Sequence, residues 1–280
     1  MCRQGGNAMK AAELFSVEGL VTVVTAGASG IGLGYAEIMA ENGADVTILD
    51  IDDAARDAAV ARLTAEGGKA RGMKVDVRDK AALDMAFAEV VGRAGRLDVV
   101  FANAGISGGP GFLAMDLSRP EATAFENAPV ELWDRVLSFN IGTVARTIQA
   151  ALPYMKRQKS GSIIVTSSCS ATKTELFVGA PYVTSKAAVA HLVRQLAVEI
   201  GRYNVRVNAI APGPVVTNIA GGRLKDPATQ AFFGKYCPMG RMGQPDDLKG
   251  AALLLASNAG YFMNGAELLV DGGVTQGAAD

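Results

Sequence analysis

Tyr182 and Lys186 stand four residues apart in APYVTSKAAVAHLVRQLAVEI, a run that predicts a long amphipathic helix. On a helix this spacing places a phenol and an ammonium on one face, about one turn apart. A free tyrosine titrates near pH ~10, and a neighbouring cation lowers that pKa by favouring the phenolate. Such a phenol can exchange a proton with an alcohol or carbonyl oxygen. Two residues that share a helix surface by chance would show the same spacing.

A glycine-rich segment, TAGASGIG, follows the first β-branched run of the chain. Gly27, Gly30 and Gly32 lie there between a predicted strand and a predicted helix. Glycines at such a place permit a tight turn and a close approach of the backbone to a pair of phosphates. The helix N-terminus adds amide donors and a positive dipole end. The alternative interpretation is a turn with no ligand.

Asp50 ends the second predicted strand, 18 residues beyond Gly32. A carboxylate at this place accepts both hydroxyls of a ribose and repels a 2′-phosphate. Ala28, Ser29 and Ile51 supply no cation to relieve that repulsion, so we expect NAD rather than NADP. The alternative interpretation of Asp50 is an ordinary helix cap, since two further aspartates follow it.

The elements that must position these residues are short apolar strands separated by helical stretches. We predict strands at 20–26, 44–50, 70–77, 97–105, 161–168, 205–213 and 266–273. This alternation predicts an α/β fold, a single doubly wound, Rossmann-type parallel sheet with helices on both faces. No linker or repeat divides the chain, so we expect one domain over 1–280, with an N-terminal extension over about 1–15.

Composition excludes several classes of function. The 280 residues carry a formal net charge of -1 and no basic block, which argues against nucleic-acid and anionic-membrane partners. The three scattered cysteines predict neither a disulfide framework nor a metal site, and the single His191 suits packing or an interface better than catalysis. No signal segment or apolar run of ~18 residues is present, so we expect a cytoplasmic protein.

The chain resembles the short-chain dehydrogenase/reductase family over roughly residues 15–275. Its motifs occur in the family's order along the sequence. They are TAGASGIG (25–32), DV (76–77), NAG (103–105), Asn140, SS (167–168), YVTSK (182–186), PG (212–213) and DGG (271–273). A chance series in this order is very improbable, so the resemblance makes Tyr182 and Lys186 a functional pair.

The resemblance implies a role for each catalytic residue. Tyr182 would be the general acid/base, and Lys186 its electrostatic partner and a ligand of the nicotinamide ribose. Ser168 would position the substrate oxygen, and Asn140 would hold a water that extends a proton relay from Lys186. No metal is implied.

The resemblance also implies a set of cofactor contacts. Asp76 and Val77 would contact the adenine, Asn103 and Ala104 would line the cleft, and Thr217 would reach the carboxamide. Together with Tyr182 and Lys186, the implied cofactor-binding residues are Gly27, Ser29, Gly30, Ile31, Gly32, Asp50, Ile51, Asp76, Val77, Asn103, Ala104, Gly105, Pro212, Gly213, Val215 and Thr217.

The sequence departs from the family pattern at two positions. Ala26 stands where the family has its first glycine, which matters if the site requires a positive φ. Cys169 stands 13 residues before the tyrosine, where the family places its serine, and it is flanked by Ser168 and Ser170. We favour Ser168, because IIVTSS aligns with the family's strand end. No neighbour in the sequence would activate the Cys169 thiol.

Substrate contacts are expected from the variable segments. Residues 106–130 form a long connection, and 215–243 resemble the family's flap over the substrate. Glu175, Phe177 and Val178 follow the serine and are expected to face the substrate. A further group is either the lining of an apolar pocket or a set of packing anchors: Phe232, Phe233, Tyr236 and Met239.

The resulting hypothesis is an oxidoreductase that transfers a hydride between NAD(H) and a secondary alcohol or ketone of the polyol, sugar or hydroxy-acid class. The alternatives are a 3-oxoacyl-thioester reductase and a catalytically silent nucleotide-sensing protein of the same fold. Retention of Tyr182, Lys186, Ser168 and Asn140 argues against the silent protein. The resemblance also implies a homotetramer.

Overall fold

The computed structural model describes residues 9–277, so Cys2 and the first eight residues of the predicted extension lie outside the described part. The strands form one parallel sheet in the order β3-β2-β1-β4-β5-β6-β7. Their bounds are β1 (Val21–Thr25), β2 (Asp45–Asp50), β3 (Lys69–Lys74), β4 (Val99–Ala102), β5 (Gly161–Thr166), β6 (Val205–Pro212) and β7 (Glu267–Val270). The predicted fold class is confirmed.

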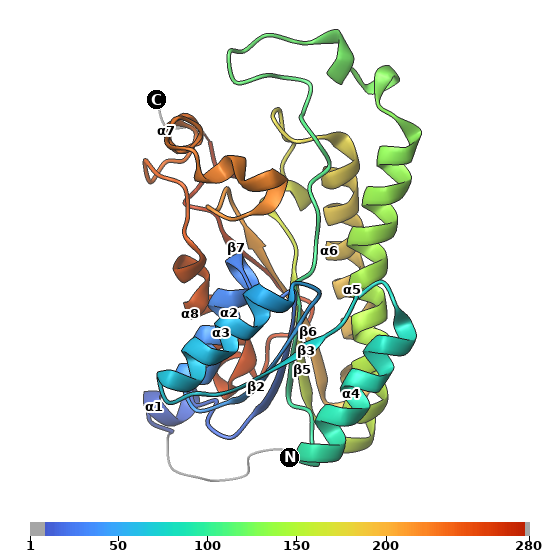
Figure 1. The fold of residues 1–280 in the computed structure, drawn as a ribbon, viewed down its shortest axis with the longest axis vertical. Helices are drawn as coiled ribbons and strands as arrows, with labels where there is room; N and C mark the ends of the chain where they lie inside the picture. The colour runs from blue at the N-terminus through green and yellow to red at the C-terminus, as the bar shows by residue number, and fades with distance from the viewer. Residues whose placement is uncertain (1–8, 278–280) are drawn as a thin grey trace.

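Helices cover both faces of this sheet (Figure 1). The α-helices are α1 (Ala11–Leu14), α2 (Gly30–Glu41), α3 (Asp53–Ala65), α4 (Lys80–Ala94), α5 (Val130–Gln158), α6 (Ala180–Ile200), α7 (Pro227–Lys235) and α8 (Lys249–Ala256). Helices α4, α5 and α6 pack together on one face, and α2, α3 and α8 on the other. The predicted helix around Tyr182 is α6.

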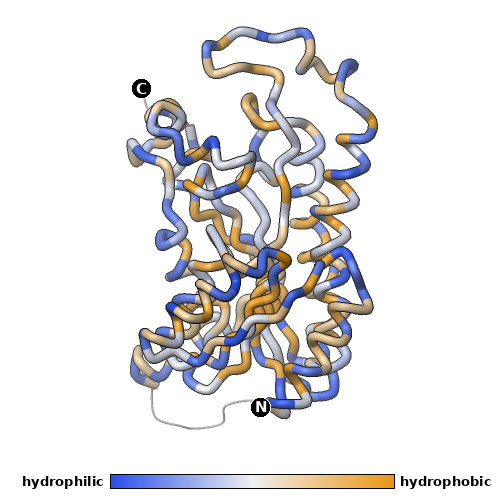
Figure 2. The backbone as a smooth tube through the Cα atoms, viewed as in Figure 1, coloured by the Kyte–Doolittle hydropathy of each residue, from blue (hydrophilic) through white to orange (hydrophobic). Residues whose placement is uncertain are grey.

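Two hydrophobic cores follow from this layering. Side chains such as Phe87 and Ile148 fill the core under α4, α5 and α6, and side chains such as Tyr35 and Met39 fill the core under α2 and α8. Figure 2 shows the hydrophobic segments concentrated in the strands between the helical layers. Strand β1 is buried along its whole length, as a central parallel strand covered on both faces must be.

Three strands end three residues earlier than the sequence predicts. The predicted strands 70–77, 97–105 and 266–273 end at Lys74, Ala102 and Val270. After β4 the Asn103 amide donates to Thr25 Oγ1 (3.0 Å) instead of continuing the ladder. After β7 the Asp271 carboxylate accepts the amide of Gly273 (3.0 Å). Polar side chains therefore turn the chain out of the sheet at the edge where the predicted site residues lie.

The strand order reverses between β1 and β4, both of which pair with parallel neighbours. Ligands of open α/β sheets bind at the carboxyl ends of the strands beside such a reversal. The predicted site segments leave the carboxyl ends of β1, β2, β4, β5 and β6. The fold thus gathers segments from distant parts of the chain along one edge of the sheet. Among the described residues, no helix has both the length and the apolar character needed to cross a membrane.

Candidate active site

The glycine-rich loop joins β1 to α2, which begins at Gly30. A Cβ atom on Gly32 would lie 2.5 Å from Asn103 Nδ2 and closer still to the carbonyl oxygen of Ala26, so only glycine fits there. Gly30 has φ +54°, and its Cβ would lie 3.3 Å from Thr217 Cγ2. The loop therefore leaves its backbone and the first amides of α2 accessible at close range, which suits a phosphate pair.

Ala26 adopts φ +50°, in the left-handed region that favours glycine. Two hydrogen bonds hold it there. Its amide donates to the carbonyl oxygen of Leu49 (2.8 Å), and its own carbonyl oxygen accepts from Asn103 Nδ2 (3.2 Å). The loop thus keeps the conformation that a glycine would adopt, although the residue carries a methyl group.

The Asp50 side chain, at the end of β2, connects this strand to the glycine loop by a hydrogen bond. Its Oδ2 accepts the amide of Ala28 (3.1 Å), and its Oδ1 accepts the amide of Asp52 (3.1 Å). The N-cap of α3 is Asp52, so Asp50 is not the cap of that helix. A negative charge therefore lies directly beside the loop.

Tyr182 and Lys186 both lie in the first half of α6, and Lys186 Nζ is 5.6 Å from the centre of the Tyr182 ring. The Lys186 side chain is almost fully buried, and its Nζ donates to the carbonyl oxygen of Thr166 at the end of β5 (2.8 Å). Burial lowers the pKa of Lys186 to about 8. The ammonium is therefore close to losing its proton in the physiological range.

Burial raises the pKa of Tyr182 to about 12, and the nearby Ser168 hydroxyl offsets only part of this rise. The expectation that Lys186 leaves the phenol with a lowered pKa is wrong for this arrangement, because removal of the phenolate from water outweighs the lowering effect of Ser168, and the charge of Glu175 raises the pKa further. Tyr182 is consequently a neutral phenol at neutral pH, with a proton to donate.

Residues 168–170, which follow β5 closely, differ in what their side chains contact. The Ser168 hydroxyl lies close enough to Tyr182 to lower the pKa of the phenol. It also donates a hydrogen bond to Ser170 Oγ (3.0 Å) and accepts one from the backbone amide of Ser170 (3.2 Å). Burial raises the pKa of the Cys169 thiol to about 12, so this thiol stays protonated. The geometry brings Ser168 beside the phenol and leaves Cys169 without an activating neighbour.

Asn140 is fully buried in α5 and binds two other elements. Its Oδ1 accepts the amide of Ile106 (2.8 Å), while its Nδ2 donates to the carbonyl oxygen of Ile106 (3.1 Å) and to Ser185 Oγ (2.9 Å). A Cβ on Gly105 would lie 3.5 Å from Lys186 Nζ and 3.6 Å from Asn140 Oδ1. The side-chain amide of Asn140 and the ammonium of Lys186 therefore lie beside the same space, next to Gly105.

The remaining predicted cofactor residues lie around the same edge. Thr217 packs on Gly30, and Val215 pairs with Gly243. Asp76 is bound by the exposed Arg78 (2.6 Å), whose guanidinium holds the pKa of that carboxyl below its usual range. The others divide by burial: Val77, Ala104 and Pro212 are buried, Gly213 and Ile31 are half-buried, and Ser29 and Ile51 are exposed.

A set of glycines that the sequence patterns did not predict holds the connection 106–130 against the start of α6. A Cβ on Gly108 would lie 2.6 Å from the backbone nitrogen of Tyr182. A Cβ on Gly111 or Gly179 would overlap backbone atoms of the opposite segment. Pro110 pairs antiparallel with Val178, so the start of the connection 106–130 is a short ribbon leading to Tyr182. The only signal in the sequence is the run GGPG.

The segment 215–243 is closed at its base and carries an aromatic cluster. The amide of Val216 donates to the carbonyl oxygen of Gly243 (2.9 Å). The Phe177 ring lies 5.1 Å from Phe232, 5.7 Å from Phe233 and 5.3 Å from Tyr236, centre to centre. These aromatics pack on the segment that follows Ser168, whereas Met239 is exposed. The interpretation as packing anchors therefore fits them better than the interpretation as an open pocket lining.

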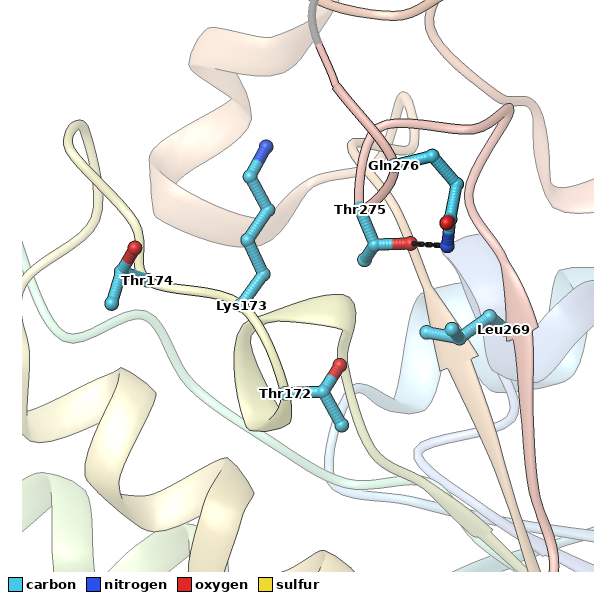
Figure 3. A pocket seen from close by; sticks show the side chains of 6 residues that line it. All are labelled: Thr172, Lys173, Thr174, Leu269, Thr275 and Gln276. Atoms are coloured by element: carbon cyan, nitrogen blue, oxygen red, sulfur yellow. Dashed lines mark hydrogen bonds between the residues drawn. The ribbon is translucent and has the colours of Figure 1, made fainter.

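A hollow lies between the residues after Ser168 and the C-terminal segment (Figure 3). Its lining residues are Thr172, Lys173, Thr174, Leu269, Thr275 and Gln276. The Lys173 ammonium donates to the carbonyl oxygen of Val274 (2.6 Å). None of the four predicted catalytic residues lines this hollow, so it borders the candidate site rather than containing it.

Within residues 9–277, no group of three or more His, Cys, Asp or Glu side chains is arranged to hold a metal ion. His191 is exposed on α6, where its Nδ1 lies 3.4 Å from an Arg194 guanidinium nitrogen. It is therefore not a core residue.

The chain is similar to a sorbose reductase and to a 5-keto-D-gluconate 5-reductase along nearly its whole length. A family model described as enoyl-(acyl carrier protein) reductase matches residues 25–275. Sorbose reductase of Candida albicans is 35% identical over 265 residues, which cover 94% of this chain and 89% of that protein. The 5-keto-D-gluconate 5-reductase of Escherichia coli K12 is 34% identical over 264 residues, which cover 94% of this chain and 98% of that protein.

Solved structures show the same architecture. A short-chain type dehydrogenase/reductase from Mycobacterium marinum has a TM-score of 0.83 and 32% identity, covering 94% of this chain and 98% of that one. A gluconate 5-dehydrogenase from Burkholderia cenocepacia in complex with NADP and tartrate has a TM-score of 0.81 and 31% identity over 95% and 99%. A 7α-hydroxysteroid dehydrogenase complexed with NADH has a TM-score of 0.83 and 29% identity over 97% and 99%.

Proposed function

Because this chain belongs to the short-chain dehydrogenase/reductase family, an oxidoreductase family that uses a nicotinamide cofactor, we propose that Tyr182, Lys186, Ser168 and Asn140 form the catalytic set for a secondary alcohol or ketone. The observation that carries the proposal is the neutral Tyr182 phenol, flanked by the Ser168 hydroxyl and the buried Lys186 ammonium. NAD(H), when bound, supplies the hydride in reduction and accepts it in oxidation.

In the reduction of a ketone, Tyr182 would donate its proton to the carbonyl oxygen as negative charge develops there. Ser168 would hold the same oxygen by a hydrogen bond, so that the phenol and the hydroxyl fix its position. The phenolate left on Tyr182 would be stabilised by Lys186, whose Nζ is 5.6 Å from the ring centre. In alcohol oxidation, the phenolate would take the proton back.

Lys186 and Asn140 would connect the phenol to the rest of the site. The Thr166 carbonyl oxygen fixes the Lys186 ammonium, and Asn140 fixes the loop after β4. Both groups border the space beside Gly105, where a water could pass a proton between them. This arrangement supports the relay role proposed for Asn140.

We propose NAD as the preferred cofactor, on the strength of Asp50. Its carboxylate lies against the glycine loop, where it would accept the ribose hydroxyls and repel a 2′-phosphate. The residues that could relieve such repulsion with a cation, Ala28, Ser29 and Ile51, carry no positive charge. The glycine loop, Thr217 and the residues after β4 would complete the cofactor site.

For the substrate, we propose a polyol, sugar or related hydroxy compound. Two relatives that match nearly the whole chain are named for sorbose and for 5-keto-D-gluconate, both polyhydroxy compounds. The polar side chains of Ser170 and Glu175 beside Ser168 support the same class.

We further propose a cytoplasmic homotetramer. Large apolar side chains are exposed near the β7 edge of the sheet, among them Phe262 (99% exposed), and Val198 on α6 is 85% exposed. Contact between subunits would remove such surfaces from water.

The state of the cysteines bears on the location of the protein in the cell. Cys169 and Cys237 form no disulfide, as expected in a reducing compartment. Light scattering tests the assembly, and cell fractionation tests the location.

The decisive experiment compares the unaltered protein with Tyr182→Phe in the reduction of ketoses and cyclic ketones by NADH. The variant removes the transferable proton and keeps the ring, so kcat is expected to fall by ~100-fold or more while NADH still binds. Binding of NADH by fluorescence, with no turnover of any ketone or alcohol by the unaltered protein, would overturn the enzymatic role.

A further inference from the structure

Glu175 lies in the segment that leads from Ser168 to α6, and its side chain is half-buried. The carboxylate faces back toward the residues after β5. Its Oε1 accepts from the Ser170 hydroxyl at 3.5 Å and from the Cys169 thiol at 3.5 Å. Both contacts are long, and both donors are themselves buried. The structure thus holds a carboxylate two polar contacts away from the serine proposed to bind the reacting oxygen.

A short chain of polar groups connects Glu175 to the reacting centre. The Ser168 hydroxyl lies 3.0 Å from Ser170 Oγ, which in turn lies 3.5 Å from Glu175 Oε1. The charge of Glu175 also reaches the phenol, since it contributes to the raised pKa of Tyr182. A substrate oxygen held between Ser168 and Tyr182 would therefore be separated from Glu175 by the hydroxyls of Ser168 and Ser170.

The carboxylate of Glu175 retains capacity to bind a ligand. A carboxylate offers about four acceptor positions, and the contacts above occupy at most two, both on Oε1. The nearest basic side chain in sequence, Lys173, donates its hydrogen bond to the carbonyl oxygen of Val274 (2.6 Å), although its charge partly offsets the rise in the pKa of Glu175. Burial raises the pKa of Glu175, which marks a carboxylate that has lost much of its water. A donor from the substrate would replace that water.

We propose that Glu175 determines substrate specificity by accepting a hydrogen bond from a hydroxyl on the carbon next to the reacting carbon. The inference rests on the proposed function and narrows its substrate class to vicinal diols and α-hydroxy ketones. A ketone that lacks this hydroxyl leaves the carboxylate without its partner. The same negative charge repels a carboxylate attached directly to the reacting carbon, so neutral sugars and polyols are favoured over 2-hydroxy acids.

The test compares two ketones that differ by one hydroxyl, cyclohexanone and 2-hydroxycyclohexanone, in reduction by NADH. Glu175→Gln preserves the shape of the side chain and removes its charge. Because hydrogen bonds to charged groups are the stronger class, kcat/KM for 2-hydroxycyclohexanone is expected to fall by about 10- to 100-fold, mainly through KM. The value for cyclohexanone is expected to stay within about twofold of the unaltered protein.

Two further variants separate recognition from a structural effect. Glu175→Asp keeps the charge and is expected to restore part of the preference for the hydroxy ketone. Glu89→Gln, an exposed residue of α4, is the matched control and is expected to change neither ketone. Equal losses on both ketones in Glu175→Gln, or no loss on either, would contradict the specificity role of Glu175 and leave the proposed function standing. Failure of the unaltered protein to reduce either ketone would overturn the proposed function as well.

Discussion

Gly108 lies directly against the backbone of Tyr182, the proposed general acid. A Cβ atom at residue 108 would lie 2.6 Å from both the nitrogen and the Cβ of Tyr182, and 3.1 Å from its Cα. Backbone atoms at the start of a helix cannot move aside as the end of a flexible side chain can. The connection 106–130, which follows β4, thus sets the position of the first turn of α6 and of the Tyr182 phenol.

Gly108→Ala is therefore expected to displace Tyr182 and to lower kcat by about 10- to 100-fold, because misplacement of a catalytic group by about 1 Å costs that much. Steady-state kinetics of ketone reduction measure the loss. Gly92→Ala in α4 is the matched control, since a Cβ there meets no atom within 4 Å. Unchanged kcat in Gly108→Ala would show that the contact relaxes without moving the phenol.

Ketone reduction is expected to lose rate as the pH rises through about 8. Lys186, with its pKa lowered to about 8 by burial, then loses the charge that stabilises the phenolate of Tyr182. Tyr182 itself stays protonated, because its pKa is about 12. A kcat profile from pH 6 to 10 measures the decline, and a flat profile would contradict the role of Lys186.

Unfolding does not explain such a decline. The folded-state pKa of Lys186 lies below its unfolded value of 10.5, so the unfolded chain binds more protons between about pH 8 and 10.5. This group alone makes the fold more stable as the pH rises through that window. Urea denaturation at pH 7 and pH 10 provides the control.

Ala26→Gly is expected to raise the free energy of unfolding by up to about 1.5 kcal/mol. A left-handed alanine costs about 1–2 kcal/mol, and the greater freedom of glycine in the unfolded chain offsets about 0.5–1 kcal/mol. Chemical denaturation measures the change. Ala88→Gly, at an exposed position inside α4, should lower the stability instead, and the same sign for both variants would contradict the strain at φ +50°.

Asp50→Asn removes the charge and retains an oxygen that can accept from the Ala28 amide. The ratio of kcat/KM with NADP to that with NAD is expected to rise by at least ~10-fold, since repulsion of the 2′-phosphate disappears. Parallel kinetics with both cofactors give the ratio. Asp84→Asn, an exposed residue of α4, should leave it unchanged. A constant ratio in Asp50→Asn would place cofactor discrimination elsewhere.

Phe177→Ala removes the ring that joins the 215–243 segment to the residues after Ser168. We expect KM for the ketone to rise by about 10-fold with a smaller change in kcat, and the unfolding free energy to fall by about 1–3 kcal/mol. Kinetics and thermal denaturation measure both. Phe15→Ala, at the end of α1, is the control and should leave KM for the ketone unchanged. A loss confined to stability would make the aromatic cluster purely structural.

Much of the fold followed from local sequence. The β-branched run at 20–26 and the glycines after it predict β1, the turn and the start of α2, because these preferences act over a few residues. The same holds for the placement of Asp50 at a strand end. Strand ends were predicted less well, since Asn103 and Asp271 turn the chain through contacts with residues distant in sequence or through their own side chains.

The chain sequence by itself determined which chemical groups are available and in what order: a Tyr–Lys pair on one helix, a serine after a strand and a carboxylate beside a glycine loop. Only the tertiary structure decided their protonation and their surroundings. Burial raises the Tyr182 pKa and lowers that of Lys186, and desolvation depends on every element packed around a group. The contact of Gly108 with Tyr182 likewise joins segments that no local pattern relates.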